Sequence, residues 1–355
     1  MIPLVRWPGG LENELVNILP YVPKEIENFY DPFLGSGAVY FATSADGYYV
    51  NESCGELIEI YKAAKKGRRS MWHTLESACH AWKSVEARVI GVQDELLQLA
   101  FEYPRKWNRN YPGFCLAVKD VLKGIWFTDL FTFMIPDPTD FGMELRHQVI
   151  DAVIHIAEKD MDDEDAIEEI LTGMKAAVFY FLSEVYYNPS VDGGIRCATL
   201  IFTSHYSKEP GFYWDYPELD EEDRKKMEEA GESVVPQNRP EYMGADFNRV
   251  YLDEILAMRE NEAFGQKMSH THLWNVTPSH FLQKNKITYD DFLFMVPQAD
   301  SDRKAAMDYI KSPRCNTRWM LLIPEVPEME QLILMQGVST MELSPKSGMI
   351  MFKNY

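Results

Sequence analysis

Short apolar runs bounded by turn residues lie near both ends of this chain, and longer helical periodicities fill its middle. The short runs predict buried strands, because each is about as long as a strand and ends in polar or turn residues. They cover residues 26–31, 47–52, 291–296, 318–323 and 349–352. Strands that alternate with helical sequence are typical of an α/β sheet.

The middle of the chain has apolar residues at helical spacing. This spacing predicts helices over residues 75–82, 85–100, 145–158, 168–187 and 246–262. Two segments interrupt the pattern, because residues 198–202 and 267–274 have the composition or alternation of strands. We therefore expect an α/β domain built from residues 1–56 and 285–355, with a mostly helical insertion at residues 57–284.

A glycine turn follows the first predicted strand. Pro32 and Phe33 come directly after Asp31, Gly35 and Gly37 follow them, and residues 38–42 have the sequence of a helix start. Such a turn lets a nucleotide-like ligand lie against bare backbone at a helix N-terminus, although glycine pairs also occur in purely structural loops.

Two neighbouring features support a ligand site. The second strand ends at Glu52, 21 residues after Asp31, a spacing that suits a carboxylate accepting ribose hydroxyls in a doubly wound sheet. Upstream, the glycine pair Gly9 and Gly10 follows Arg6 and Trp7 and again permits close approach of backbone to a ligand.

This combination of motifs resembles the Dam-like class of DNA adenine-N6 methyltransferases. The resemblance extends to the end of the chain, where residues 350–355 form an apolar strand followed by Asn-Tyr. It implies an S-adenosylmethionine-dependent, Rossmann-like sheet with a large, mainly helical inserted target-recognition region, acting on double-stranded DNA with a flipped base. The residues it implies for cofactor binding are Arg6, Trp7, Gly9, Gly10, Asp31, Pro32, Phe33, Gly35, Gly37 and Glu52.

The catalytic motif departs from that family. Its members carry Asp-Pro-Pro-Tyr after the strand that corresponds to residues 291–295, and the acid accepts hydrogen bonds from the adenine amino group while the ring stacks on the base. Here the four positions are Val296, Pro297, Gln298 and Ala299. We expect catalysis to be lost or rebuilt from neighbouring groups, of which Gln298, Asp300 and Asp302 are nearest.

A second departure lies in the N-terminal motif. The family usually has a lysine after the glycine pair, where this chain has Leu11. Both departures fall on the catalytic side, while the cofactor loop is retained.

The charge of the chain weakens the DNA interpretation, because the formal net charge is −20 and DNA-binding proteins normally carry a basic footprint. Much of the acid lies at residues 160–169 and 218–232, whereas residues 62–69 and 105–111 are locally basic. The second basic segment also holds aromatic residues, so its cations are candidate DNA contacts; a solvated loop is the alternative. These cations are Arg105, Lys106 and Arg109.

Three hypotheses remain open from the sequence. They are an adenine-N6 methyltransferase, a catalytically silent homologue that binds cofactor or DNA, and an acidic DNA mimic. The retained glycine loop and Glu52 favour the first two, because a mimic does not need a cofactor pocket.

The remaining composition bears on compartment and on metal binding. Five scattered cysteines and the lack of a signal peptide or of an apolar run of about 20 residues indicate a cytoplasmic protein with reduced thiols and no membrane span. His270 and His272 have no third ligand at a plausible spacing, so we expect no metal site. The oligomeric state is not predicted.

Overall fold

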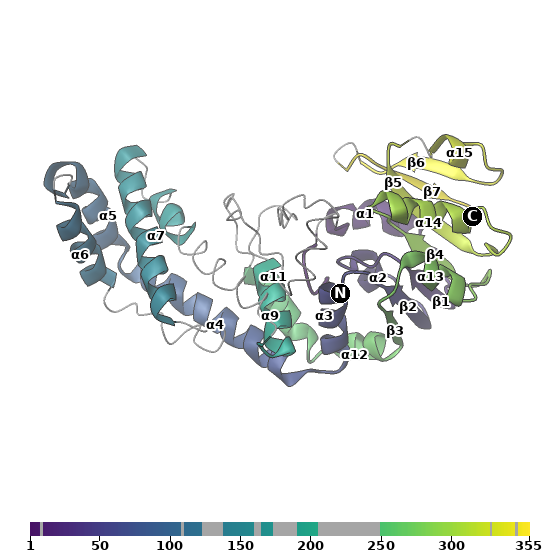
Figure 1. The fold of residues 1–355 in the computed structure, drawn as a ribbon, viewed down its shortest axis with the longest axis horizontal. Helices are drawn as coiled ribbons and strands as arrows, with labels where there is room; N and C mark the ends of the chain where they lie inside the picture. Colours follow the sequence, from purple (N-terminus) through teal and green to yellow (C-terminus); the bar gives the residue numbers. More distant parts are fainter. Residues whose placement is uncertain are drawn as a thin grey trace, which may run out of the picture. The chain divides into compact units, whose positions relative to one another are not determined.

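The computed structural model describes residues 1–7, 10–107, 110–122, 138–159, 165–172, 190–204, 249–326, 329–344 and 347–355. The chain divides into two compact units, one made of residues 1–68 and 253–355 and the other of residues 69–252. The first unit holds all seven strands of the described sheet (Figure 1). The predicted α/β sheet is therefore confirmed.

The strand order is β3-β2-β1-β4-β5-β7-β6. Strands β1 to β5 pair in parallel, and the hairpin of β6 and β7 joins β5 in antiparallel fashion. The strands are β1 Asn28–Asp31, β2 Gly47–Asn51, β3 Thr271–Trp274, β4 Phe292–Met295, β5 Arg318–Pro324, β6 Ser339–Glu342 and β7 Met349–Lys353.

The topology places a switch point between β1 and β4. From β1 the chain proceeds outward to β2 and β3, whereas β4 lies on its other side and leads to β5. The end of β1 at Asp31 is thus adjacent to the end of β4, because Tyr30 pairs with Leu293. Ligands of doubly wound sheets bind at such a point, outside the carboxyl ends of the strands.

Helices cover both faces of this sheet. On one face Phe29 of β1 contacts the ring of Tyr40 on α2, with ring centroids 6.5 Å apart. On the other face Tyr30 meets Phe281 of α13 and joins an apolar core cluster with residues of α14. The helices of this unit are α1 Leu15–Ile18, α2 Ala38–Ala42, α3 Gly55–Lys65, α12 Glu262–Ser269, α13 Pro278–Lys284, α14 Asp300–Ile310 and α15 Met329–Ile333, with 3-10 turns at Glu12–Glu14 and Leu19–Tyr21.

The C-terminal residues Asn354 and Tyr355 form hydrogen bonds to other parts of the first unit. Asn354 accepts a hydrogen bond from the backbone of Trp319 at 2.8 Å and donates one to the carbonyl of Thr317 at 2.9 Å. Tyr355 donates to the carbonyl of Tyr21 at 2.6 Å. The last two residues thereby connect the start of β5 to the N-terminal segment.

A buried lysine from helix α12 binds the carbonyls at the C-terminal end of helix α2. Lys267 is 7% exposed and donates to the carbonyls of Tyr40 at 2.6 Å and Thr43 at 2.5 Å, while its ammonium lies 4.3 Å from the ring centroid of Tyr48. Burial lowers the pKa of Lys267 to about 7. A cation at a helix C-terminus satisfies carbonyls that have no partner within the helix.

We expect Lys267→Ala to lower the free energy of unfolding by about 1–3 kcal/mol, since the buried carbonyl of Tyr40 loses this donor and that of Thr43 keeps the Tyr48 hydroxyl at 3.3 Å. Chemical denaturation of the variant measures this loss. Lys284→Ala is the matched control, because Lys284 is exposed at the end of α13. An equal effect of the two substitutions would contradict the assigned role of Lys267.

The described part of the second unit is helical. Its elements are α4 Arg69–Gly91, α5 Gln93–Glu102, a π-helical turn η3 at Tyr103–Trp107, α6 Tyr111–Val121, α7 Pro138–Lys159, α9 Gly193–Ser204 and α11 Arg249–Met258, the last of which crosses the boundary between the units. Helix α9 packs against α4, and α7 packs against α5 and α6 (Figure 1). Residues 165–172 are helical, and the rest of the helix predicted at 168–187 lies outside the described residues.

The strand predicted at residues 198–202 was wrong, because this segment belongs to α9. The run has β-branched residues, and residues 197–202 are all buried. Packing of α9 against α4 overrides the local strand preference.

The strand predicted at residues 267–274 is shorter than expected. Residues up to Ser269 end helix α12, and only Thr271–Trp274 form β3, which pairs with β2. Residues 57–68 and 253–284, which we expected in the helical insertion, belong to the first unit.

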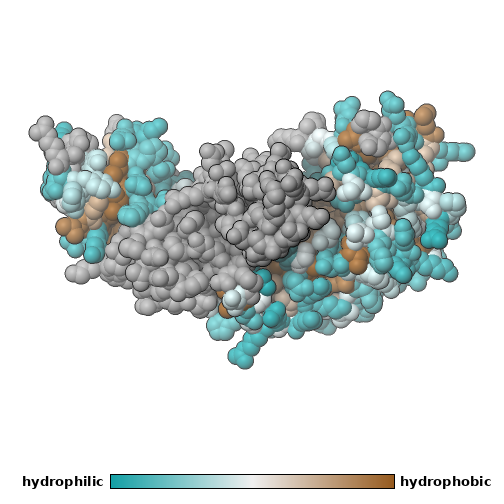
Figure 2. Space-filling model, in the orientation of Figure 1, coloured by the Kyte–Doolittle hydropathy of each residue, from teal (hydrophilic) through white to brown (hydrophobic). Residues whose placement is uncertain are grey.

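The visible surface of the first unit is mainly hydrophilic, with hydrophobic residues in small groups (Figure 2). Among the described residues no helix combines the length and the apolar character needed to cross a membrane.

Candidate functional site

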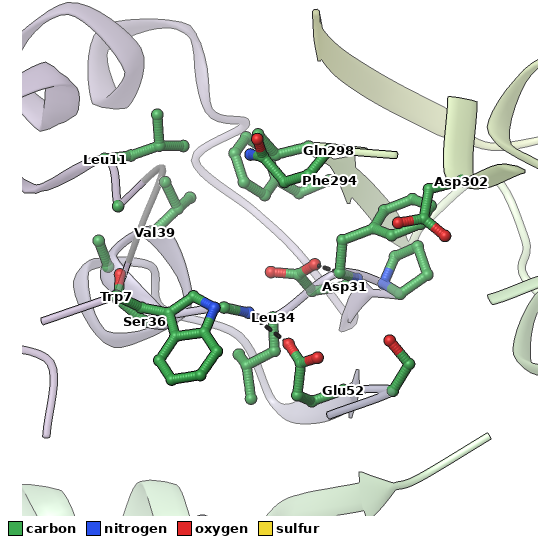
Figure 3. Close-up of a pocket in the computed structure, with 17 residues that line it drawn as sticks. Trp7, Leu11, Asp31, Leu34, Ser36, Val39, Glu52, Phe294, Gln298 and Asp302 are labelled. Carbon is green, nitrogen blue, oxygen red and sulfur yellow. Dashed lines mark hydrogen bonds between the residues drawn. The ribbon is translucent and has the colours of Figure 1, made fainter. Parts of the chain in front are cut away.

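A pocket lies at the switch point, where β1, β2 and β4 end (Figure 3). The N-terminal segment and the first turn of α14 complete its wall. The lining residues are Trp7, Gly10, Leu11, Asp31, Pro32, Phe33, Leu34, Gly35, Ser36, Ala38, Val39, Glu52, Ser53, Phe294, Val296, Gln298 and Asp302.

The glycine loop requires its two glycines. Gly35 and Gly37 have φ angles of +51° and +72°, in the left-handed region where other residues are strained. A side chain at Gly37 would also crowd the Tyr61 hydroxyl, which would lie 3.2 Å from its Cβ. That hydroxyl, on helix α3, donates to the carbonyls of Gly35 and Ser36 and so fixes the loop between β1 and α2.

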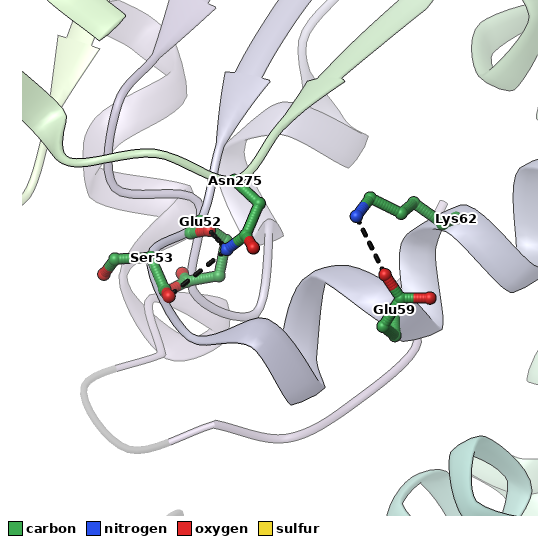
Figure 4. Close-up of polar contacts among 5 residues, drawn as sticks. All are labelled: Glu52, Ser53, Glu59, Lys62 and Asn275. Atoms are coloured by element: carbon green, nitrogen blue, oxygen red, sulfur yellow. Dashed lines mark hydrogen bonds and ion pairs between the residues drawn. The ribbon is translucent and has the colours of Figure 1, made fainter. Parts of the chain in front are cut away.

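Glu52 lies beyond the end of β2 and its carboxylate faces the glycine loop. Its two oxygens accept hydrogen bonds from the backbone N–H of Gly35 at 2.9 Å and of Cys54 at 2.8 Å. Asn275 donates to the carbonyls of Glu52 and Ser53, which holds the turn from outside (Figure 4). The carboxylate is therefore oriented before any ligand binds, with acceptor positions left over.

Asp31 is buried at the end of β1, with 2% of its surface exposed. It accepts a hydrogen bond from the backbone of Phe33 at 2.9 Å. Burial, assisted by the nearby charge of Glu52, raises the pKa of Asp31 to about 8. Burial likewise raises the pKa of Glu52, with the charge of Asp302 acting in the same direction. The three carboxyl groups are thus close enough to influence one another.

The polar wall of the pocket is acidic. Among the described residues that line it, Asp31, Glu52 and Asp302 are acidic and no residue is basic. Desolvated carboxylates that repel one another favour a cationic ligand, because its charge relieves both penalties.

The opposite wall is apolar. Leu11 and Val39 lie across the view from the acidic side chains in Figure 3, near Phe294 and Gln298. Val296 also lines the pocket and is 6% exposed. Gln298 supplies the one amide on this side, and its backbone carbonyl accepts a hydrogen bond from Arg303 at 2.8 Å.

The pocket gathers most of the predicted site residues. Those that line it are Trp7, Gly10, Asp31, Pro32, Phe33, Gly35, Glu52, Val296 and Gln298. Arg6, Gly37, Pro297 and Ala299 lie nearby in sequence but are not part of its wall. Ala299 is exposed and precedes α14. Gly9 lies outside the described residues.

Sequence reasoning did not name several wall residues as site residues. Leu34, Ser36, Ala38 and Val39 come from the loop and helix that follow β1, Ser53 follows Glu52, and Phe294 belongs to β4. Their proximity to the predicted motifs was the available signal.

Two predicted DNA contacts lie in the second unit. Arg105 lies 5.9 Å from the ring centroid of Phe101, and Lys106 pairs with Glu102 at 2.9 Å. Both side chains are exposed. Arg109 lies outside the described residues.

The two histidines considered as metal ligands have other contacts. The ring of His270 bonds to the carbonyl of Gln266 at 2.9 Å, and that of His272 stacks on Tyr49 with centroids 4.6 Å apart. Within the described ranges no group of three or more His, Cys, Asp or Glu side chains could hold a metal ion.

Comparison with known proteins identifies the N-terminal motifs. Residues 7–88 match the family model of the D12 class N6 adenine-specific DNA methyltransferases. The match covers the N-terminal part of the chain, which holds the glycine loop and Glu52. The resemblance predicted from the glycine loop and Glu52 is confirmed, and the D12 match supports neither the acidic mimic nor the silent homologue.

Two curated relatives agree with the D12 match. The chain is 32% identical over 63 residues to the Type II methyltransferase M1.LlaDCHI of Lactococcus lactis subsp. cremoris, covering 18% of this chain and 22% of the relative. It is 30% identical over 70 residues to the Type II methyltransferase M.CviBI of Paramecium bursaria Chlorella virus NC1A, covering 19% and 27%. The chain thus matches about a quarter of the length of these relatives.

Proposed function

We propose that the pocket binds S-adenosylmethionine and that the chain is built to transfer its methyl group to the N6 amino group of a flipped adenine in DNA. The observation that carries the proposal is the position of the glycine loop. Gly35 binds Glu52 at the switch point of the sheet, within the segment that matches the family.

The residues present fit this cofactor. Its ribose hydroxyls need acceptors, and the Glu52 carboxylate keeps acceptor positions free beside its backbone donors. Its methionine part carries a sulfonium, an ammonium and a carboxylate, and the acidic wall supplies the opposite charge for the two cationic groups. A Cβ at Gly35 would make ordinary van der Waals contact with the ring of Trp7 at 3.8 Å and the carbonyl of Phe33 at 4.0 Å, so the positive φ is what favours glycine here.

The cofactor supplies an electrophilic methyl group when bound. The chain's own part is to fix the ribose through Glu52, to balance the positive charge and to bring the acceptor base to the apolar wall near Val296 and Gln298. We further propose that Arg105, Lys106 and Arg109 contact DNA phosphates, and that the protein works in the cytoplasm.

Calorimetric titration with S-adenosylmethionine, together with transfer of labelled methyl to mixed-sequence duplex DNA, tests the proposal. We expect one binding site per chain. No binding at any accessible concentration would overturn the proposal. We expect transfer to be slow, because Val296 and Ala299 stand where the family has its acceptor and its stacking ring. Binding with no transfer even after these two groups are restored would favour the catalytically silent homologue.

Glu52→Ala should weaken cofactor binding by about 1–3 kcal/mol, because a carboxylate that accepts ribose hydroxyls is lost. Calorimetry measures the change. Thermal unfolding of the variant, and of Glu52→Gln, shows whether the loop held by Gly35 and Cys54 has survived.

Glu59→Ala is the matched control for that substitution. Glu59 is exposed on helix α3 and pairs with Lys62 at 2.8 Å, away from the pocket wall (Figure 4). It should bind the cofactor as the unaltered protein does. If a folded Glu52→Ala variant has unchanged affinity, the cofactor binds elsewhere.

A further inference from the structure

A third carboxylate faces the pocket from an element outside the family match. Asp302 lies in the first turn of α14, and its side chain is drawn toward the pocket near Asp31 in Figure 3. It lines the same pocket as Glu52, and its charge helps to raise the pKa of that carboxyl. Burial raises the pKa of Asp302 itself.

The neighbouring arginine is engaged elsewhere. Arg303 forms an ion pair with Asp300 and donates to the carbonyl of Gln298 at 2.8 Å. The charge of Arg303 lowers the pKa of Asp302, but its guanidinium bonds to these other two groups. Asp302 therefore keeps a carboxylate directed at the pocket, in contrast to Asp300, whose side chain is 94% exposed.

We infer that Asp302 is a cofactor-binding residue that makes the pocket select a positively charged sulfur ligand over a neutral one. The inference rests on the proposed function. S-adenosylmethionine carries one more positive charge than its demethylated product, S-adenosylhomocysteine, and the two are otherwise nearly the same shape. A wall with three carboxylates and no basic residue among those described distinguishes them by charge.

This selectivity bears on turnover. Loss of the methyl group removes the sulfonium charge, so the attraction that holds the cofactor weakens once transfer has occurred. The product then leaves a pocket whose carboxylates again repel one another.

The test compares three ligands by calorimetry at pH 8. They are S-adenosylmethionine, S-adenosylhomocysteine and an analogue with a protonated amine in place of the sulfonium, which is cationic and cannot react. In the unaltered protein we expect the two cationic ligands to bind about tenfold or more tightly than the neutral product.

Asp302→Asn should reduce that preference by about tenfold through weaker binding of the cationic ligands, with little change for S-adenosylhomocysteine. Asp308→Asn is the matched control, because Asp308 lies on the same helix, is exposed and does not line the pocket. It should leave all three affinities unchanged.

Two outcomes would overturn the inference and a third concerns the proposed function. If Asp302→Asn binds all three ligands as the unaltered protein does, or loses them all equally while remaining folded, Asp302 does not read the charge. If the unaltered protein binds none of the three, the proposed cofactor site itself fails.

Discussion

Methyl transfer to DNA by the unaltered protein is expected to be undetectable, or slower by about 10³ or more than in relatives with an intact motif. Val296 cannot accept a hydrogen bond from the adenine amino group through its side chain, and Ala299 cannot stack on the base. Val296 lines the pocket next to Phe294, so the position of the missing acceptor is apolar.

Restoring the two groups tests the reason for the loss. The double substitution Val296→Asp with Ala299→Tyr should create or raise methyl transfer, since Val296 faces the pocket and Ala299 is exposed enough to accept a larger side chain. Transfer of labelled methyl to duplex DNA measures the gain, with each single substitution as a control. Robust transfer by the unaltered protein, abolished by Gln298→Ala, would show instead that Gln298 has become the acceptor.

The affinity for S-adenosylmethionine should rise with pH by up to about tenfold per unit between pH 6 and 8. Burial raises the pKa of Asp31 to about 8, so the group is mainly protonated in the free protein below that pH. A cationic ligand favours the carboxylate, and binding therefore releases a proton. Calorimetry at three pH values measures the slope, and Asp31→Asn should flatten it.

The same shift has a consequence for stability. The pKa of Asp31 in the folded state exceeds its ordinary value of 3.8, so the folded protein holds more protons than the unfolded chain between about pH 4 and 8. The contribution of Asp31 to stability is present below that window and is lost as the pH rises through it. Denaturation of the ligand-free protein should show this loss, and a pH-independent affinity together with a pH-independent unfolding midpoint would refute the assigned ionisation.

The central strands could be predicted because they are mainly apolar runs, whereas the exposed edge strand β6, Ser339–Glu342, was not predicted. All residues of β4 are buried, and a fully buried strand has no polar face to obscure its pattern. The edge strand β3 was harder to predict from the sequence, because only Thr271 of its four residues is buried. Its pairing with β2 depends on the sheet, which a local alternation of residues does not reveal.

The helical unit was less accessible to sequence reasoning. Residues 198–202 have β-branched and aromatic side chains, yet they lie in α9 because their buried face packs on α4. A contact between segments so distant in sequence cannot be read from either one alone.

Some residues of the candidate site could be predicted from the sequence, and others required the fold. Asp31, Gly35 and Glu52 could be named from the chain because one short motif fixes their geometry. The sequence could not tell whether Asp300 or Asp302 faces the pocket, since the two acids are two residues apart. In the fold Asp302 lines the pocket, whereas the side chain of Asp300 is 94% exposed. The apolar wall required the adjacency of β1 and β4.

Hydrogen exchange with and without S-adenosylmethionine tests the central claim most directly, because it locates the ligand on the unaltered chain. We expect slower exchange in residues 31–39, 51–54 and 296–302, which surround the pocket, and no change in residues 101–106 of the second unit, none of which lines it. Unchanged exchange across all three pocket segments at a saturating concentration, or protection confined to the second unit, would contradict the account.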